Sequence, residues 1–481
     1  MRDLKRLPIQ RRSLLLGAAV VAASPALATA APPARYRITL LSASPPRFAV
    51  QAELPTAGRD LSMFDSYPAE LPQMAARGWP ALISELVVRD ASGAALATAQ
   101  IDNGWRLPGA PTGPVTLDYV VDLGVFAAAG WSSPLESVIA GDGVMSVIGR
   151  ALFIGSGHAG PVEVNFVLPA PWRAVAPWAA RGGTRFAVRD QAELIDNMLV
   201  FSTTPPIVAQ AAGFTLQITA MGHWRPLGGA LKRALTRIIA AETALMGWTR
   251  REVYNVVLLP VADTGGEAYR QSFAYCFTDP TVANAPAWAN TLAHEIFHYW
   301  NYARLKGADY ASTQWFQEGF TEYVANLVLM TGKVASPSVF LGKLSKHIEN
   351  AAKLTTTLEN IGTRKGPPLY SAGALVAFSW DVAIRRATAG RRDIGAFFRN
   401  LLRVTGDGAR RYAWSDIRGA LEATAPGAWE EFHQRHIKGD ERLPIEASLA
   451  MAGLKLEAGV VSIDPNADPA GKAAWRDLQT P

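Results

Sequence analysis

The stretch HEIFH at residues 294–298, followed after nineteen residues by Glu318, decides the fold of the central part of the chain. On a helix, this spacing places His294 and His298 one turn apart on the same face, where both imidazoles can bind one Zn²⁺. Glu295 then lies beside the metal, where it can take a proton from a zinc-bound water. Glu318, in the segment WFQEGF (315–320), is the most suitable third ligand. Three protein ligands leave a fourth position for water, so the spacing predicts one catalytic Zn²⁺ per chain.

The alternative interpretation of HEIFH is a core helix whose two histidines bond to neighbouring groups. The chain has only seven histidines, so two of them at metal-ligand spacing around a glutamate are rarely a coincidence. The other positions of this helix are apolar, as expected for a helix whose back is buried behind a cleft. His347, His433 and His436 have no partner at metal-ligand spacing, so we expect them at the surface or in packing.

The regions on either side of the zinc motif have different periodicities. Between residues 36 and 201, alternating apolar runs such as VTLDYVV (115–121) are separated by Gly and Pro, which favours an antiparallel β-sandwich. Beyond residue 336, helical spacing predicts an all-α lobe. We therefore expect a multidomain α+β protein. Its predicted parts are an N-terminal β-sandwich (31–220), an α/β domain with the zinc helix (221–335), a helical C-terminal lobe (336–455) and a loose tail rich in Pro, Ala, Gly and Asp (456–481).

The pattern of residues 1–30 predicts a signal peptide. Residues 1–12 include five basic side chains, and an apolar run follows at 14–21. Small residues around Ala28 and Ala30 then offer cleavage sites. The segment RRSLL (11–15) resembles a twin-arginine signal. A retained membrane helix is the alternative, but the apolar run is short and Pro25 breaks it. We expect an exported bacterial protein, periplasmic or secreted, with no stable membrane span after cleavage.

Composition limits the class of partner. The formal net charge is +6, but the leader holds five basic residues and one acidic residue, which leaves about +2 for the rest. Such a weak bias does not indicate nucleic acid or an anionic membrane as partner. The single cysteine, Cys276, cannot form an internal disulfide, so stability must come from apolar cores. With 49% hydrophobic residues, the chain has enough material for two or three domains.

The second half of the chain resembles the glycyl aminopeptidase family of bacterial zinc metallopeptidases, within the gluzincin clan. The similar segments are HEIFHYWN (294–301), WFQEGFTEY (315–323), YSAGALV (370–376), FHQRH (432–436), LP (443–444) and GL (453–454). The resemblance covers about residues 225 to 455. It implies a thermolysin-like α/β zinc-peptidase domain, the ligand set His294, His298 and Glu318, and a peptide or protein as substrate.

Three features depart from this family's pattern. Ala372 stands where the family usually carries Lys, and GGEAY (265–269) places its glutamate one position early. The chain ends at Pro481, where many relatives continue into a PDZ domain, so we expect a catalytic unit without that domain.

Further roles are implied by the resemblance or by helix geometry. Tyr370 is similar to the family's tyrosine that donates to the oxyanion; its alternative is a packing tyrosine. Glu267, after Gly265 and Gly266, would bind the substrate's N-terminal amine on an edge strand that aligns the peptide. Glu322, four residues after Glu318, could accept a hydrogen bond from a zinc histidine; its alternative is a solvated helix carboxylate.

The predicted function is therefore an exported zinc aminopeptidase that releases small N-terminal residues, with Glu295 as general base and Tyr370 supporting the oxyanion. An endopeptidase using the same residues is one alternative. A zinc-stabilised binding protein without turnover is the other, although a purely structural site would not need a base at Glu295.

Overall fold

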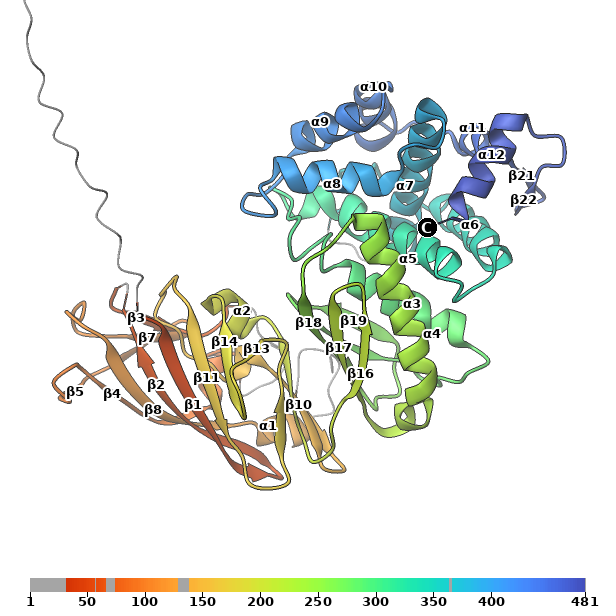
Figure 1. The fold of residues 1–481 in the computed structure, drawn as a ribbon. Coiled ribbons are helices and arrows are strands. Elements are labelled where there is room, and N and C mark those ends of the chain that lie inside the picture. Colours follow the sequence, from red (N-terminus) through yellow and green to blue (C-terminus); the bar gives the residue numbers. More distant parts are fainter. Residues whose placement is uncertain (1–31, 57, 66–73, 129–137, 363–365, 481) are drawn as a thin grey trace, which may run out of the picture.

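The computed structural model describes residues 32–56, 58–65, 74–128, 138–362 and 366–480. The predicted leader (1–30) lies outside the described residues. Figure 1 shows the all-β N-terminal part on one side, the helical lobe on the other, and a five-stranded sheet with its helices between them. In the described part of the chain, no helix combines the length and apolarity needed to cross a membrane.

The N-terminal part contains two main sheets and a small three-stranded one. The large sheet has the order β13 (Ala179–Ala180), β14 (Arg185–Val188), β11 (Val162–Val167), β1 (Ala34–Ala43), β2 (Pro46–Leu54), β8 (Val115–Asp122), β4 (Ile83–Arg89), β5 (Ala95–Leu96). The second sheet has the order β12 (Arg173–Val175), β15 (Met198–Ser202), β10 (Val144–Ile148), β9 (Val138–Gly141). The small sheet has the order β3 (Asp60–Ser62), β7 (Gly104–Arg106), β6 (Ala99–Ile101), and two short helices are α1 (Gly124–Ala128) and α2 (Gln191–Ile195).

Period-two alternation explains how the large sheet packs. In β1, Tyr36 and Ile38 are buried while Arg35 and Arg37 are exposed, so one face meets a core and the other meets water. Aromatic side chains from both sheets fill that core; the rings of Phe48 and Phe201, for example, lie 4.9 Å apart. The pairing is antiparallel throughout the two main sheets except between β1 and β11, which run parallel.

The central sheet has the order β16 (Ile207–Ala211), β17 (Phe214–Ala220), β18 (Glu252–Leu258), β20 (Ser272–Cys276), β19 (Gly265–Ala268). The predicted start of the α/β domain at residue 221 is therefore too late, because β16 and β17 already belong to the sheet of this domain. Helices α3 (Gly228–Met246), α4 (Ala285–Phe297) and α5 (Gln314–Thr331) belong to the same core. Val256 and Leu258 face these helices, whereas Val257 and Leu259 face the β-sandwich. Burial on both faces explains why this strand reads as a continuous apolar run.

The C-terminal lobe is helical, as its periodicity predicts. It contains α6 (Pro337–Ala351), α7 (Pro367–Thr388), α8 (Ile394–Val404), α9 (Trp414–Thr424), α10 (Trp429–His433) and α11 (Ile445–Met451). The buried carboxylate of Asp381 on α7 ties three helices together. It accepts hydrogen bonds from Tyr323 Oη at 2.6 Å on α5, from Arg385 Nε at 3.0 Å, and from the backbone N–H of Ile394 at 2.9 Å at the start of α8.

The prediction of a loose tail after residue 456 is wrong. The chain forms a hairpin, β21 (Leu454–Glu457) and β22 (Val460–Ile463), and a final helix α12 (Pro469–Leu478). The composition resembles a loop, but Asp468 caps the helix by accepting from the N–H of Gly471, and Pro469 occupies the first helical turn. Trp475 and Leu478 are then buried against the lobe.

Candidate metal centre

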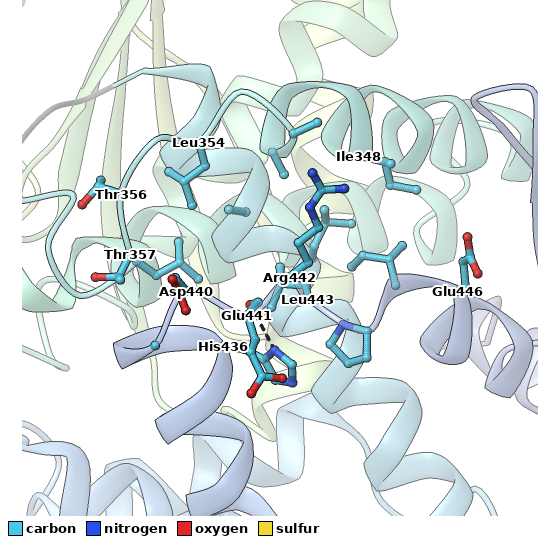
Figure 2. Close-up of a pocket in the computed structure, with 18 of the residues that line it drawn as sticks. Ile348, Leu354, Thr356, Thr357, His436, Asp440, Glu441, Arg442, Leu443 and Glu446 are labelled. Atoms are coloured by element: carbon cyan, nitrogen blue, oxygen red, sulfur yellow. Dashed lines mark hydrogen bonds between the residues drawn. The ribbon is translucent and has the colours of Figure 1, made fainter.

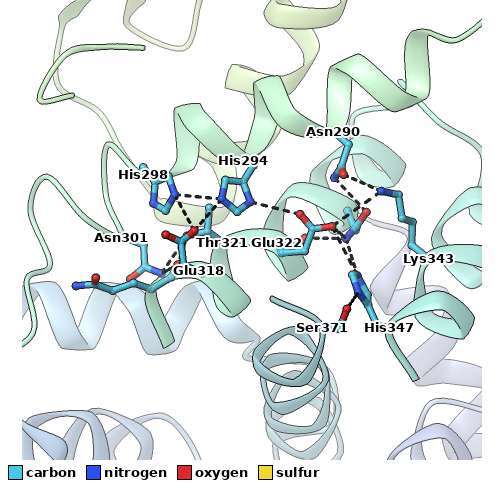
Figure 3. Close-up of polar contacts among 12 residues, drawn as sticks. Asn290, His294, His298, Asn301, Glu318, Thr321, Glu322, Lys343, His347 and Ser371 are labelled. Carbon is cyan, nitrogen blue, oxygen red and sulfur yellow. Dashed lines mark hydrogen bonds and ion pairs between the residues drawn. The ribbon is translucent and has the colours of Figure 1, made fainter. Parts of the chain in front are cut away.

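The predicted ligands His294, His298 and Glu318 lie together (Figure 3). His294 Nε2 is 3.1 Å from His298 Nε2 and 3.3 Å from Glu318 Oε2. The distance between His298 Nε2 and Glu318 Oε2 is 3.5 Å. All three residues are buried, and in the described part of the chain they form the cluster of His, Cys, Asp and Glu suited to hold a metal ion. The helices explain this arrangement: His294 lies in the last turn of α4 and His298 caps its C-terminus one turn later, and α5 crosses α4 with Glu318 in its first turns.

The spacing of the donor atoms fits zinc. Bonds of about 2.0–2.1 Å in a tetrahedral site place neighbouring ligand atoms roughly 3.3 Å apart, which is the separation of the three atoms here. Two imidazole nitrogens and one carboxylate oxygen are also the donor types of catalytic zinc sites. The residues present therefore fit a zinc ion.

The electrostatics of the cluster favour positive charge at its centre. Burial alone would lower the pKa of His294, but its hydrogen bonds with Glu318 and Glu322 outweigh burial and raise this pKa to about 10. Burial would raise the pKa of Glu318, yet the two histidines hold it well below its usual range. Such a site stabilises a cation among its carboxylates.

Glu322 lies behind His294 and fixes its orientation. Its Oε2 is 3.3 Å from His294 Nδ1, so an Nδ1–H can donate to Glu322 while Nε2 faces the cluster. Burial opposes ionisation of Glu322, but the hydrogen bond from His294, together with the electrostatic effects of His347 and Lys343, lowers its pKa to about 2. Its side chain is 14% exposed, which does not fit the alternative of a solvated helix carboxylate.

Glu295, on α4, has its side chain against the edge strand β19. It is 6% exposed, and a Cβ placed on Gly266 would come within 2.6 Å of its carboxyl carbon. Only a glycine at this position therefore allows β19 to approach the Glu295 side chain so closely. Gly265 and Gly266 thus lie beside the predicted base, at the open edge of the five-stranded sheet.

Tyr370 approaches the cluster from a third helix, α7. Tyr370, in the first turns of α7, has its ring 5.8 Å from that of His294. Burial and the carboxylates of Glu318, Glu295 and Glu267 raise the pKa of Tyr370 well above its usual range, so its hydroxyl keeps a proton to donate. Glu267 lies half-buried on the edge strand β19, one residue after Gly266.

Several residues around Glu322 were not predicted as part of the site. His347, expected at the surface or in packing, is buried and has its Nε2 3.7 Å from Glu322 Oε1. Asn290, Asn326 and Lys343 join the same polar group. No spacing in the sequence links α4, α5 and α6 at these positions, because only their tertiary packing brings them together. The other two histidines agree with expectation: His433 stacks on Trp414, and His436 lies at a lobe surface.

A separate cavity of about 800 Å³ lies between α6, α7 and residues 439–447 (Figure 2). None of the predicted site residues lines it. Ala372, the departure from the Lys of the glycyl aminopeptidase pattern, is in its wall together with Leu375. This cavity is thus distinct from the metal centre.

Comparison with known proteins gives one family and a group of structures. Residues 287–361 match the model of the M61 glycyl aminopeptidase family, a segment that holds the metal cluster and Glu322 but ends before Tyr370. No protein with a curated description matches the chain.

The solved structures share the fold. An aminopeptidase N family protein from Idiomarina loihiensis is 18% identical with a TM-score of 0.72, covering 88% of this chain and 79% of its own. An M1 zinc metallopeptidase from Deinococcus radiodurans is 15% identical with a TM-score of 0.55, covering 86% and 94%. A variant of the latter, determined with a Tyr-Ser-Ala substrate, is 14% identical with a TM-score of 0.55 and the same coverage.

Proposed function

We propose that this chain, a zinc peptidase of the aminopeptidase type related to the M61 glycyl aminopeptidases, removes small N-terminal residues from peptides with one Zn²⁺ per chain. The observation that carries the proposal is the buried group of His294, His298 and Glu318, with Glu295 on one side and Tyr370 on another. A structural metal site would not need a buried base and a protonated phenol beside its ligands.

Each residue has a role that follows from its place. His294, His298 and Glu318 would hold a zinc ion, which would supply Lewis-acid chemistry at the scissile carbonyl and make the attacking water more acidic. Glu295 takes the proton of this water and returns it to the leaving amine. Tyr370 donates its hydroxyl hydrogen to the oxyanion that develops on the carbonyl oxygen.

Binding of the free amine distinguishes an aminopeptidase from an endopeptidase. Glu267 on β19 supplies a half-buried carboxylate that pairs with the substrate's N-terminal ammonium. Because β19 is an edge strand, a peptide can align along it by strand addition. Both contacts place the first peptide bond of the substrate, rather than an internal one, at the metal.

A panel of aminoacyl chromogenic substrates tests this function, with the amine free or acetylated and with or without a chelator. We expect hydrolysis of free glycyl and alanyl substrates, loss of activity with the chelator, and little hydrolysis of acetylated substrates. Efficient cleavage inside a blocked peptide would instead identify an endopeptidase. Zinc-loaded protein that cleaves none of these substrates would be a zinc-stabilised binding protein.

We further propose export from a bacterial cell with removal of the leader. Basic residues, an apolar run and small residues near Ala28 and Ala30 support this. The mature chain should begin near residue 29 or 31, as N-terminal sequencing of the native protein would reveal. An intact Met1 on a cytoplasmic species would contradict export.

A further inference from the structure

A buried polar network continues from the metal centre on the far side of Glu322 (Figure 3). Glu322 faces His294 with Oε2, and its Oε1 accepts a hydrogen bond from Asn326 Nδ2 at 3.1 Å. The ring of His347, 7% exposed, lies next to the same oxygen, with Nε2 at 3.7 Å. The carboxylate that orients a predicted zinc ligand is thus itself held by side chains of α5 and α6.

Helix α6 also bonds to the zinc-binding helix. Lys343 Nζ donates to Asn290 Oδ1 at 2.8 Å and lies 4.0 Å from Glu322 Oε1. Asn290 is one turn before His294 on α4, and its Nδ2 donates to Asn326 Oδ1 at 3.2 Å. A displacement of α6 would therefore pull on both α4 and α5.

The other side of His347 reaches the helix that carries Tyr370. His347 Nδ1 lies 3.1 Å from Ser371 Oγ, and Ser371 is the residue after Tyr370 on α7. Asn326 Nδ2 can donate to His347 Nε2 at 3.3 Å, so the neutral ring accepts at Nε2 and donates at Nδ1 to Ser371. Burial lowers the pKa of His347, which agrees with a neutral ring.

Four helices therefore contribute to one buried network: α4 with Asn290, α5 with Glu322 and Asn326, α6 with Lys343 and His347, and α7 with Ser371. Three of them carry predicted site residues. Helix α6 carries none of the predicted site residues. Its Lys343 nevertheless bonds to α4, and its His347 bonds to α5 and α7. A network used only for packing would not need a continuous path from a metal ligand to the turn that bears the oxyanion donor.

We propose that His347 is a positioning residue. It holds the first turns of α7, and with them Tyr370, at a fixed position relative to Glu322 and the zinc ligand His294. The proposal rests on the proposed function, since Tyr370 matters only if an oxyanion forms. His347 touches neither substrate nor metal. It acts through Ser371 on one side and Glu322 on the other.

Two substitutions separate these two sides. His347→Leu keeps most of the buried volume but loses both hydrogen bonds, whereas Ser371→Ala loses only the bond to α7. Ser379→Ala is a matched control, because Ser379 is buried on the same helix and bonds to Ser448 Oγ at 2.8 Å, away from the metal centre. Each change is made in the wild type and in the Tyr370→Phe background.

The first readout is kcat against KM for a free-amine substrate. We expect His347→Leu and Ser371→Ala to lower kcat about 10-fold, the lower end for outer partners of a metal site, with little change in KM. In the Tyr370→Phe background the same changes should have little further effect, because the group they position is already absent. Ser379→Ala should leave kcat unchanged in both backgrounds.

The second readout is the rate of zinc release to a chelator, which does not depend on turnover. His347→Leu should release zinc several-fold faster than wild type, because Glu322 is held less firmly, whereas Ser371→Ala should release it at the wild-type rate. If the wild type binds zinc but hydrolyses nothing, the proposed function fails while this readout still tests the Glu322 side of the network.

Three results would overturn the proposal. They are unchanged kcat in His347→Leu and Ser371→Ala, equal losses of kcat in the presence and absence of the Tyr370 hydroxyl, and zinc release from His347→Leu at the wild-type rate. A loss of thermal stability without any of the expected kinetic changes would likewise mean that the network only packs the helices.

Discussion

Gly319 and Gly373 contact each other backbone to backbone where α5 crosses α7. A Cβ on Gly373 would lie 2.8 Å from the Cα of Gly319, and the carbonyl oxygen of Trp315 would be closer still. Gly319 directly follows the predicted ligand Glu318, and Gly373 is one turn after Tyr370. Two glycines thus allow the helix with the tyrosine to approach the helix with the metal ligand.

This contact predicts the effect of adding one methyl group. Gly373→Ala should destabilise the protein by about 1–3 kcal/mol, because backbone atoms cannot move aside cheaply. It should also lower kcat, since α7 moves away and takes Tyr370 with it. Thermal unfolding and steady-state kinetics provide the measurements. Gly342→Ala is the control: it lies inside α6 with no atom near its Cβ position and should slightly stabilise the helix. Equal stability of the two variants would disprove the close contact.

The proposed role of Glu295 as general base can be tested separately from metal binding. Glu295→Gln keeps the size of the side chain but cannot take a proton, so turnover should fall by about 10²-fold or more. Zinc content, measured by elemental analysis, should stay at the wild-type level. Turnover close to that of the wild type would show that Glu295 is not the base.

Gly266 should matter for Glu295 rather than for folding. Gly266→Ala would force the Glu295 carboxylate to move, and a displacement of about 1 Å can cost roughly 10²-fold in rate. We expect lower kcat with unchanged zinc content, again with Gly342→Ala as control. An active Gly266→Ala protein would mean that β19 and Glu295 are less closely packed in solution.

Glu267 should determine the preference for a free amine. Glu267→Ala should cost about 2 kcal/mol, some 30-fold in kcat/KM, for free-amine substrates, mainly through KM. Acetylated substrates, which lack the ammonium, should respond little. Glu446→Ala removes an exposed carboxylate from the helical lobe and serves as control. The same small loss for both substrate types would remove Glu267 from the substrate site.

The sequence predicts those parts of the site that local helix geometry determines. His294 and His298 share a face because they are one turn apart, and Glu318 and Glu322 do so for the same reason on α5. The approach of His347 and Lys343 to Glu322 could not be predicted, since it depends on how α6 packs against α5 and α7. Nor could the tail helix, whose stability comes from burial of Trp475 against a distant part of the lobe. The assignment of β16 and β17 to the central sheet likewise depends on strand pairing, which composition does not encode.

The central claim is that one zinc ion, held by His294, His298 and Glu318, makes this chain a peptidase. The most direct test is to remove all metal with a chelator and titrate zinc back while following hydrolysis of an alanyl substrate with a free amine. Activity should be absent at the start, rise in proportion to added zinc, and level off at one zinc per chain; Glu318→Ala should need about 10-fold more zinc. Full activity in the metal-free protein, or a Glu318→Ala titration that matches the wild type, would contradict the claim.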